Sequence, residues 1–345
     1  MTDPPDVRSH GASGNRKPPA TIYDIARTAG VSPSTVSRAL NKPGRINART
    51  ERRIREVAEE LGYRRNPMAG ALPTGRTGTI GLIVSDVTNP VYFDLIHGAE
   101  RVTASEGHTL VLADAQESPD TESETAERLL LSTDGLLLVG SRLDDARILE
   151  LAEHKPLVLV NRSVPGLPGI VPDPLPGIRM ALDHLASLGH RSIAFLSGPA
   201  TSWMSGVRWE TLLDEALRRD IGIVEIGPGI PTLEGGRQSL RRVRAARVTA
   251  VVAYNDLMAI GLLQAAKAAD VEVPEHLSIV GFDDIFGSSL TTPTITTIRS
   301  PLDRVGEAAI RRLIAEIDED DHSADVTLFT EFIERESTAA PRARR

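Results

Sequence analysis

The chain has 345 residues, 41% of them hydrophobic, and is therefore long enough for two or three domains with buried cores. It contains no cysteine, which excludes disulfides, thiolate catalysis and cysteine-ligated metals, and its eight histidines show no metal-ligand spacing. No apolar run approaches about 18 residues and the N-terminus lacks a hydrophobic signal core, so we expect neither a membrane span nor secretion.

The net charge of −8 is distributed unevenly along the chain. Residues 1–76 hold 14 Lys and Arg against 7 Asp and Glu, whereas the remaining residues hold 25 against 40. A basic head on an acidic body predicts an anionic partner for the head alone. Residues 1–19 are polar, rich in Pro and Gly, and aperiodic, so we expect a disordered tail there.

Three short helices are predicted after this tail. Thr21 caps the first helix and Gly30 ends it. Ser32, followed by a proline, begins the second helix, and Asn47 caps the third, which ends at Gly62. The very short turn between the first two helices is typical of a helix-turn-helix, in which the second helix can enter the major groove of DNA.

The second helix carries short hydroxyl side chains where an ordinary surface helix would carry Glu and Lys. Val36 and Ala39 lie on its apolar stripe, which leaves Ser34, Ser37 and Arg38 on the opposite face. Small hydroxyls and one Arg at the start of such a helix suit contacts to base edges. We predict that Arg38 reads a base and that Ser34 is the next candidate. The alternative is a poor surface helix without function.

Other side chains of the head are expected to contact DNA phosphates or to flank the base-reading helix, which gives affinity and register without sequence information. These are Thr21, Tyr23, Ser32, Pro33, Thr35, Ser37, Asn41, Lys42, Arg45, Asn47, Arg49 and Tyr63. The expected partner of the head is therefore double-stranded DNA.

The segments TIYDIARTAGVSPSTVSRALN and RINARTERRIREVAEELGYRRNPMAGAL resemble the head of bacterial regulators of the lac repressor (LacI/GalR) family. The resemblance implies a hinge that becomes helical on operator DNA, where a Leu from each of two subunits wedges into the minor groove. The residues that match this hinge pattern are Asn66, Ala69 and Leu72. Gly70 and Pro73 depart from it and disfavour a helix, so we expect a short, marginal hinge helix.

From residue 79 onward, continuous apolar runs alternate with amphipathic stretches. The apolar runs, which predict buried strands, are TIGLIVS, TLVLA, DGLLLV, PLVLV, SIAFLSG, TAVVAYND and LSIVGFDD. Helices are expected at about 91–106, 121–131, 176–188, 206–219, 256–269 and 302–315. This alternation predicts an α/β body with parallel sheets and a ligand crevice at the carboxyl ends of the strands.

The segments VSDVTNPVYFDLIHGAE, HLASLGHRSIAFLSGP and TPTITTIRSPLDRVGEAAI are similar to later signatures of the same family. The resemblance implies a two-lobed, periplasmic-binding-protein-like body that forms a homodimer and binds a small effector, such as a sugar or a related metabolite. The expected domains are a helix-turn-helix head at 20–65, a hinge at 66–77, a body at 78–335 (lobe 1 about 78–176 and 302–325, lobe 2 about 177–301 and 326–335), and a flexible tail at 336–345.

Residues just after strand ends, matched to family positions, are the candidates for effector binding, because carboxylates and guanidinium groups bind hydroxyls and aromatic faces cover sugar rings. They are Asp86, Tyr92, Phe93, Arg162, Asp173, Trp203, Arg208, Asn255 and Asp283. Three alternatives remain open. Asn255 can cap the next helix, Asp283 can form a salt bridge with Arg162, and Asp86 can form a turn.

Both tryptophans lie in one stretch, TSWMSGVRWE. We expect Trp203 in the loop before a helix and Trp209 inside that helix, in the core. Gly206 stands where several sugar-responsive family members have Arg, and Pro174 stands where Asn is usual. These departures remove polar groups from the expected pocket and indicate a less hydroxylated ligand, or little binding.

The sequence contains no nucleophile elbow, Walker loop, complete G-x-G-x-x-G or metal-binding spacing, so we predict neither an enzyme nor a bound cofactor. A periplasmic solute-binding protein would explain the body but not the basic head. We predict a cytoplasmic, nucleoid-associated transcriptional regulator, a repressor on family grounds, that binds a pseudo-palindromic operator as a dimer under effector control. The alternative is a DNA-binding regulator whose cleft has lost its effector response.

Overall fold

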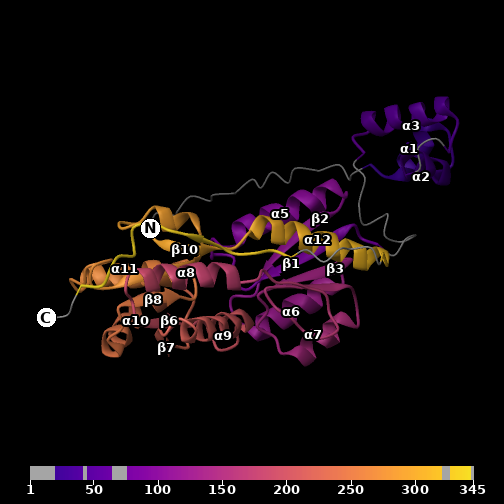
Figure 1. Cartoon of the computed structure of the whole chain (residues 1–345). Coiled ribbons are helices and arrows are strands. Elements are labelled where there is room, and N and C mark those ends of the chain that lie inside the picture. Colours follow the sequence, from indigo (N-terminus) through magenta and orange to yellow (C-terminus); the bar gives the residue numbers. More distant parts are fainter. Residues whose placement is uncertain (1–19, 42–44, 64–75, 321–326, 343–345) are drawn as a thin grey trace, which may run out of the picture. The chain divides into compact units, whose positions relative to one another are not determined.

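The computed structural model describes residues 20–41, 45–63, 76–320 and 327–342 (Figure 1). They group into two compact units, a head before residue 75 and a body from there on. The tail expected over 1–19 and most of the hinge expected over 66–77 lie outside the described residues. No helix among the described residues is long and apolar enough to cross a membrane.

The described residues of the head form three helices, α1 (Ile22–Ala29), α2 (Pro33–Asn41) and α3 (Ala48–Glu60), as the sequence predicts. The Thr21 hydroxyl accepts the N–H of Asp24 in a capping box, and the cap glycine after α1 has a φ of 69°. A small apolar core holds the helices together. Its buried members are Ile25, Ala26, Ala29, Val36, Ala39, Ile54, Val57 and Ala58.

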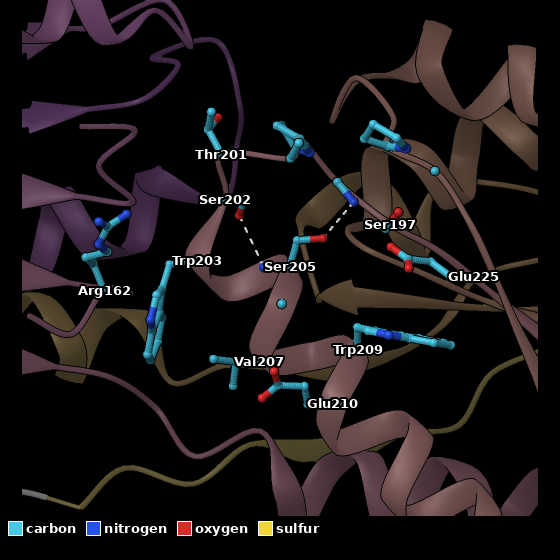
Figure 2. A pocket seen from close by; sticks show the side chains of 16 residues that line it. Arg162, Ser197, Thr201, Ser202, Trp203, Ser205, Val207, Trp209, Glu210 and Glu225 are labelled. Atoms are coloured by element: carbon cyan, nitrogen blue, oxygen red, sulfur yellow. Dashed lines mark hydrogen bonds between the residues drawn. The ribbon is translucent and has the colours of Figure 1, made fainter. Parts of the chain in front are cut away.

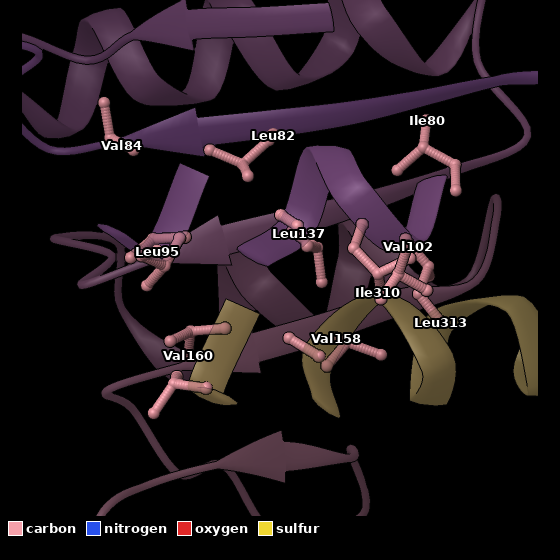
Figure 3. Close-up of a cluster of buried hydrophobic side chains, with 14 of the residues drawn as sticks. Ile80, Leu82, Val84, Leu95, Val102, Leu137, Val158, Val160, Ile310 and Leu313 are labelled. Atoms are coloured by element: carbon pink, nitrogen blue, oxygen red, sulfur yellow. The ribbon is translucent and has the colours of Figure 1, made fainter. Parts of the chain in front are cut away.

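Five parallel strands among the described residues form the sheet of the first lobe, in the order β2-β1-β3-β4-β5. They are β1 (Thr79–Val84), β2 (Thr109–Asp114), β3 (Gly135–Val139), β4 (Leu157–Val160) and β5 (Gly169–Ile170). The helices that cover it are α5 (Tyr92–Ser105), α6 (Pro119–Leu130), α7 (Asp145–Ala152) and α12 (Leu302–Asp318). Alternate strand residues are buried on opposite faces: Leu82 and Leu137 pack with α5 and α12 (Figure 3), whereas Ile83 and Leu138 pack with α6 and α7.

Helix α12 comes late in the chain but packs closely against α5 of the first lobe. Two glycines permit this approach. A Cβ on Gly98 would lie 2.0 Å from the carbonyl oxygen of Asp303, and a Cβ on Gly306 would lie 2.1 Å from that of Leu95. The first lobe is therefore completed by a segment that follows the second lobe in sequence.

The second lobe has a six-stranded sheet among the described residues, in the order β11-β10-β9-β8-β6-β7, with only β11 antiparallel to its neighbour. Its strands are β6 (Ser192–Leu196), β7 (Gly222–Ile226), β8 (Ala250–Ala253), β9 (Ser278–Asp283), β10 (Thr296–Arg299) and β11 (Glu331–Ile333). Its helices are α8 (Leu175–Ser187) and α9 (Trp203–Leu217) on one face, α10 (Leu233–Ala246) and α11 (Asp256–Ala268) on the other, and the 3₁₀ turn η1 (Phe286–Ser289). The predicted fold class, a helix-turn-helix head with an α/β two-lobed body, is confirmed.

The C-terminal segment corrects one expectation. The flexible tail predicted from residue 336 is wrong for residues 336–342, because Ser337 is fully buried and its carbonyl oxygen accepts the N–H of Ile279 at 2.8 Å. The N–H of Ala339 donates to the hydroxyl of Ser278. These small residues continue along the second lobe after β11, and hydrogen bonds of their backbone groups and of the Ser337 hydroxyl, rather than a hydrophobic pattern, hold them there.

Candidate functional site

The start of α2 gathers hydroxyl groups on the surface of the head. The Ser32 hydroxyl accepts the N–H of Thr35 at 3.2 Å and so caps the helix. Its oxygen also lies 2.8 Å from the hydroxyl oxygens of both Ser34 and Thr35. Ser32 and Ser34 are exposed, so this hydrogen-bonded cluster fixes the side chains while leaving them accessible to a partner.

The exposed and buried faces of α2 agree with the sequence pattern. Val36 and Ala39 are fully buried against the other helices, whereas Arg38 is exposed and Ser37 is half-buried. Arg38 follows Ser34 by one helical turn, so both lie on the same side of α2. The helix thus presents one guanidinium and several hydroxyls on a surface supported from below by the head's core.

The other candidates of the head surround this surface to different extents. Tyr23 is 65% exposed, and Thr21, Arg45, Asn47 and Arg49 are exposed as well. The Asn47 side chain accepts the N–H of Arg49 at 2.9 Å and so caps α3. The half-buried candidates are Pro33, Thr35 and Tyr63, the last of which packs against the core. The side chain of Asn41 and all of Lys42, Asn66, Ala69 and Leu72 lie outside the described residues.

In the body, residues of both lobes enclose a cavity of about 40 Å³, which we call the inner cavity. The first lobe contributes Asn89, Val91, Tyr92, Gly140, Arg142 and Asn161; the second contributes Ser202, Met204, Arg208, Tyr254, Asn255 and Asp283. These residues follow or adjoin the carboxyl ends of the parallel strands, which is where this class of sheet binds ligands. Four of the predicted effector residues meet there, namely Tyr92, Arg208, Asn255 and Asp283.

Arg208 is the central cation of the inner cavity. Its side chain, 7% exposed, forms an ion pair with Asp283 at 2.9 Å and donates to the carbonyl oxygen of Tyr254. The guanidinium also lies 3.6 Å from the ring centroid of Phe282 and 5.1 Å from that of Tyr254. Burial raises the pKa of Asp283, and the charge and hydrogen bond of Arg208 oppose that rise.

Two residues of the inner cavity, Arg142 of the first lobe and Tyr254 of the second, were not predicted from the sequence. Arg142 is buried and forms an ion pair with Glu117 at 2.7 Å, and it donates to the carbonyl oxygen of Gly140 at 2.9 Å. The hydroxyl oxygens of Tyr92 and Ser85 are 2.6 Å apart, and burial raises the pKa of Tyr92. Arg142 follows β3 by three residues, and Tyr254 follows β8 directly. The rule of looking just after strand ends would have found both.

Asn255 performs the capping role that its sequence position allows. Its side-chain oxygen accepts the N–H of Met258 at 2.9 Å, and its amide nitrogen donates to the carbonyl oxygen of Pro231 at 2.9 Å. It also lines the inner cavity, so capping and contact with a ligand are compatible at this residue.

A second, larger pocket lies around the first turns of α9, and we call it the outer pocket (Figure 2). Its volume is about 680 Å³. It is lined by Arg162, by residues 197–203, by Ser205, Gly206, Val207, Trp209 and Glu210, and by Glu225, Gly227 and Pro228. Ser202 lines both this pocket and the inner cavity, so the two sites adjoin.

The tryptophans of the outer pocket correct one prediction. Helix α9 begins at Trp203 rather than near residue 206, because the Ser202 hydroxyl accepts the N–H of Ser205 at 3.3 Å and starts the helix earlier. Trp209 stacks on Phe195, with ring centroids 6.2 Å apart and an interplanar angle of 12°. It is half-buried, so it packs against the core as predicted and lines the pocket as well.

The remaining candidates for effector binding lie outside the inner cavity. Arg162 pairs with Asp145 at 2.6 Å, so the alternative of a salt bridge between Arg162 and Asp283 is wrong, since each has a nearer partner. Asp86 accepts the N–H and the hydroxyl of Thr88 and forms the turn considered above. Neither pocket is lined by Asp86, Phe93 or Asp173. Phe93 is 46% exposed, and the Asp173 carboxylate accepts the N–H of Leu175 at the start of α8.

Among the described residues, no group of three or more His, Asp or Glu side chains is arranged to hold a metal ion. The fold and these sites define a class of protein: a helix-turn-helix head with an exposed recognition surface, joined to a two-lobed body with a cleft between its lobes.

Comparison with known proteins identifies the family. Residues 21–66 match the model of bacterial regulatory proteins of the lacI family, and residues 182–338 match that of the periplasmic binding protein-like domain. The chain is 34% identical over 297 residues to the HTH-type transcriptional regulator GalS of Salmonella typhimurium, which covers 84% of this chain and 87% of that protein. The chain therefore belongs to the lacI family and is a DNA-binding transcriptional regulator, as the sequence resemblance predicted.

Solved structures agree with this assignment. A lac repressor dimer bound to operator and the anti-inducer ONPF superposes with a TM-score of 0.84 at 25% identity, over 94% of this chain and 100% of that one. A LacI family regulator from Enterococcus faecium with bound ribose superposes with a TM-score of 0.66 at 26% identity, over 76% and 99% of the two chains.

Proposed function

We propose that the protein is a repressor that acts on the bacterial nucleoid, binding a pseudo-palindromic operator as a homodimer in which each head reads one half-site. The observation that carries this proposal is the surface of α2, where Arg38 and the hydroxyls of Ser32 and Ser34 are exposed above a buried apolar face. Arg38 would contact a guanine edge, and Arg45 and Arg49 would contact phosphates. The protein acts by binding, and no catalytic step is assigned to it.

A second copy of the chain is the proposed partner of the body. Strand β2 lies at the edge of the first sheet and exposes Val111 and Leu112 by 36% and 41%. In the second lobe, Phe286 and Leu290 are 63% and 75% exposed at η1. Large apolar side chains on an edge strand and on a 3₁₀ turn are costly in water, and a dimer interface would cover them.

A hydroxylated small molecule, such as a sugar, is the proposed effector, and the cleft between the lobes is its proposed site. Asp283 and Asn255 offer acceptors, Arg208 offers donors, and the rings of Tyr92 and Tyr254 flank them. The inner cavity of about 40 Å³ is far smaller than the roughly 300–1,000 Å³ of small-molecule sites. A sugar therefore requires the lobes to separate, which links occupancy to lobe movement.

The end of the proposed hinge and the residue after it are held firmly on the first lobe. Asp134 accepts the N–H groups of Thr77 and Gly78 at 2.6 and 2.7 Å, and Arg76 pairs with Asp318 at the end of α12. Movement of the first lobe would thus be transmitted to residues 66–72 by a short tether. In this mechanism the effector changes the spacing of the two hinges in the dimer and so folds or melts them.

Substitution of Leu72 tests the hinge. Leu72→Ala removes the apolar wedge proposed for the minor groove, so operator affinity and DNA bending should both fall. Gel-shift assays on circularly permuted operator fragments measure both quantities. An unchanged bend angle and affinity would refute the hinge mechanism while leaving the role of α2 intact.

A second candidate function is a DNA-binding regulator without effector response. It is favoured by the Arg208–Asp283 ion pair, which forms within a cavity too small for a sugar. Tryptophan fluorescence separates the candidates, because both tryptophans line the outer pocket beside the cleft. A metabolite that changes this fluorescence and operator affinity together supports effector control.

To test the main proposal, purified full-length protein is used to select the sequences that it binds from a pool of random DNA duplexes at fixed physiological salt. Sequencing should reveal an enriched palindrome with a flexible central step, and a metabolite panel should then change its affinity. If no sequence is enriched and the protein shows only salt-sensitive binding to all duplexes, sequence-specific repression is contradicted.

A further inference from the structure

The outer pocket, unlike the inner cavity, is large enough to hold a small molecule. Its volume of about 680 Å³ lies within the roughly 300–1,000 Å³ of small-molecule sites, whereas the inner cavity of about 40 Å³ does not. The two sites share Ser202, whose hydroxyl oxygen lies 3.0 Å from that of Tyr254 in the wall of the inner cavity. The two sites therefore share a wall at Ser202.

Two buried polar atoms on the wall of the outer pocket lack partners among the described residues. They are the Nε of Arg162 and the hydroxyl oxygen of Ser197, in residues that are 8% and 2% exposed. Arg162 comes from the first lobe and Ser197 from the end of β6 in the second. Because unpaired buried polar atoms are costly, this pair favours a ligand that brings its own acceptors and donors.

The remaining wall indicates the chemistry of that ligand. Figure 2 shows Arg162 and Trp203 towards one end of the pocket, and Trp209 and Glu225 towards the other. The lining carries one cation, Arg162, against the carboxylates of Glu210 and Glu225, and this balance disfavours a phosphate or other anion. Aromatic faces with hydroxyls and carboxylates suit the apolar faces and hydroxyl groups of a sugar ring.

We propose that the outer pocket is a second carbohydrate subsite, so that the effector contains at least two linked rings. The inner ring enters the cleft at Arg208 and Asp283 when the lobes separate. The outer ring lies against Trp203, and its hydroxyls bond to Arg162 Nε and to the Ser197 hydroxyl once movement of the lobes uncovers these atoms, both of which are buried here. This inference rests on the proposed function, because it specifies the effector of the same cleft.

Gly206 offers a direct way to close the subsite. A Cβ at this position would meet no atom within 4 Å, so a larger side chain projects into open space rather than into the core. Gly206→Phe should therefore fill the pocket without disturbing the fold. Leu217→Phe is the matched control, because Leu217 lies at the far end of the same helix and is 66% exposed.

The test is calorimetric titration of the full-length protein with sugars in matched sets. Glucose, galactose, fructose and xylose are compared with maltose, cellobiose, trehalose, lactose, sucrose and xylobiose. We expect at least one disaccharide to bind about tenfold or more tightly than either component. Gly206→Phe and Trp203→Ala should lower that affinity at least about tenfold, and Leu217→Phe should not. Operator binding without ligand verifies that each variant is folded.

The outcomes separate this inference from the proposed function. Equal binding of monosaccharides and disaccharides, or unchanged disaccharide affinity in Gly206→Phe, overturns the second subsite and leaves a carbohydrate cleft. Binding of no saccharide, with operator affinity that responds to another metabolite, overturns the subsite but leaves effector control. Binding of no saccharide and no metabolite response overturns both.

Discussion

Arg38 and Arg49 are exposed cations on neighbouring helices, but their positions predict different losses on substitution. Arg38 projects from the surface of α2, whereas Arg49 stands in the first turn of α3. Arg38→Ala should relax base preference at one operator position, at a cost of about 1–3 kcal/mol on the preferred base. Binding to a set of single-base operator variants measures this preference.

Arg49→Ala is the control for a phosphate contact. It should weaken binding to every operator variant equally and reduce the slope of log affinity against log salt by about 1. A uniform loss in Arg38→Ala would show that Arg38 contacts phosphate instead, and another residue of α2 would then read the bases.

Asp256 predicts a pH dependence of body stability. It is fully buried, and its carboxylate accepts hydrogen bonds from the Ile285 N–H and from the Ser288 and Thr297 hydroxyls. Burial raises the pKa of Asp256 from 3.8 to about 7, against the lowering effect of these bonds. Between these values the folded state holds a proton that the unfolded state has lost. The contribution of Asp256 to stability is therefore complete below pH 3.8 and is lost as the pH rises through about 7.

Asp256→Asn isolates this effect, because the amide stays uncharged and can donate to Thr297 while its oxygen accepts from Ile285 and Ser288. The stability of the wild type relative to the variant should fall by at most roughly 4 kcal/mol between pH 4 and pH 8. Urea unfolding followed by tryptophan fluorescence measures it, since both tryptophans lie in the body. A constant difference across that range would show that Asp256 stays ionised in the fold.

At the level of single residues, the sequence was enough to predict several residues of the cleft but not the ion pairs that they form. Position after a strand end was enough to name Arg208, Asn255 and Asp283, because parallel strands bring their carboxyl ends together. Which carboxylate pairs with Arg208 depends on how the folded chain brings side chains together, and no sequence pattern shows that. The same limit explains why the ion pair of the buried Arg142 with the half-buried Glu117, 25 residues apart, was not predicted.

Replacement of a helical glycine by alanine should have opposite effects on stability in α12 and in α9. Gly306→Ala in α12 places a Cβ 2.1 Å from the carbonyl oxygen of Leu95, so α5 and α12 must move apart at a cost of about 1–3 kcal/mol. Gly206→Ala in α9 meets no atom and should stabilise the body by roughly 0.5–1 kcal/mol, because alanine favours a helix. Urea midpoints followed by tryptophan fluorescence measure both changes. Stabilisation by Gly306→Ala would show that the two helices are not in close contact.

At the level of elements, long periodic segments were predicted and irregular ones were missed. Helix α10 has two adjacent glycines and four arginines, a weak helical signal, yet a Cβ on Gly236 would lie 2.1 Å from the carbonyl oxygen of Met258 in α11. Gly236 thus permits close packing of α10 on α11, whereas an argument from helix propensity counts a glycine against a helix. Helix α7 is only eight residues long, and the edge strand β7 is largely exposed, so neither shows the pattern of a buried element. Strands β5 and β11 were missed because they are short, and β10 was missed because its sequence, TTIR, is not a continuous apolar run.

At the scale of the whole molecule, dimerisation should be separable from folding. Leu112 lies on the edge strand β2 and is 41% exposed, so Leu112→Lys adds a charge to the proposed interface without entering the core. We expect sedimentation velocity to show a monomer. Affinity for the full palindrome should fall strongly, because the two heads no longer bind as a linked pair, while affinity for an isolated half-site stays the same.

Leu131→Lys is the matched control, because Leu131 is 87% exposed at the end of α6, a helix on the opposite face of the first sheet from α5 and α12. It should remain dimeric and bind the palindrome as the wild type does. If both variants are dimeric, β2 lies outside the interface, and the exposed apolar residues of η1 become the surface to substitute next. If Leu112→Lys is monomeric yet binds the palindrome with full affinity, each head acts alone and the linkage between body and operator spacing must be abandoned.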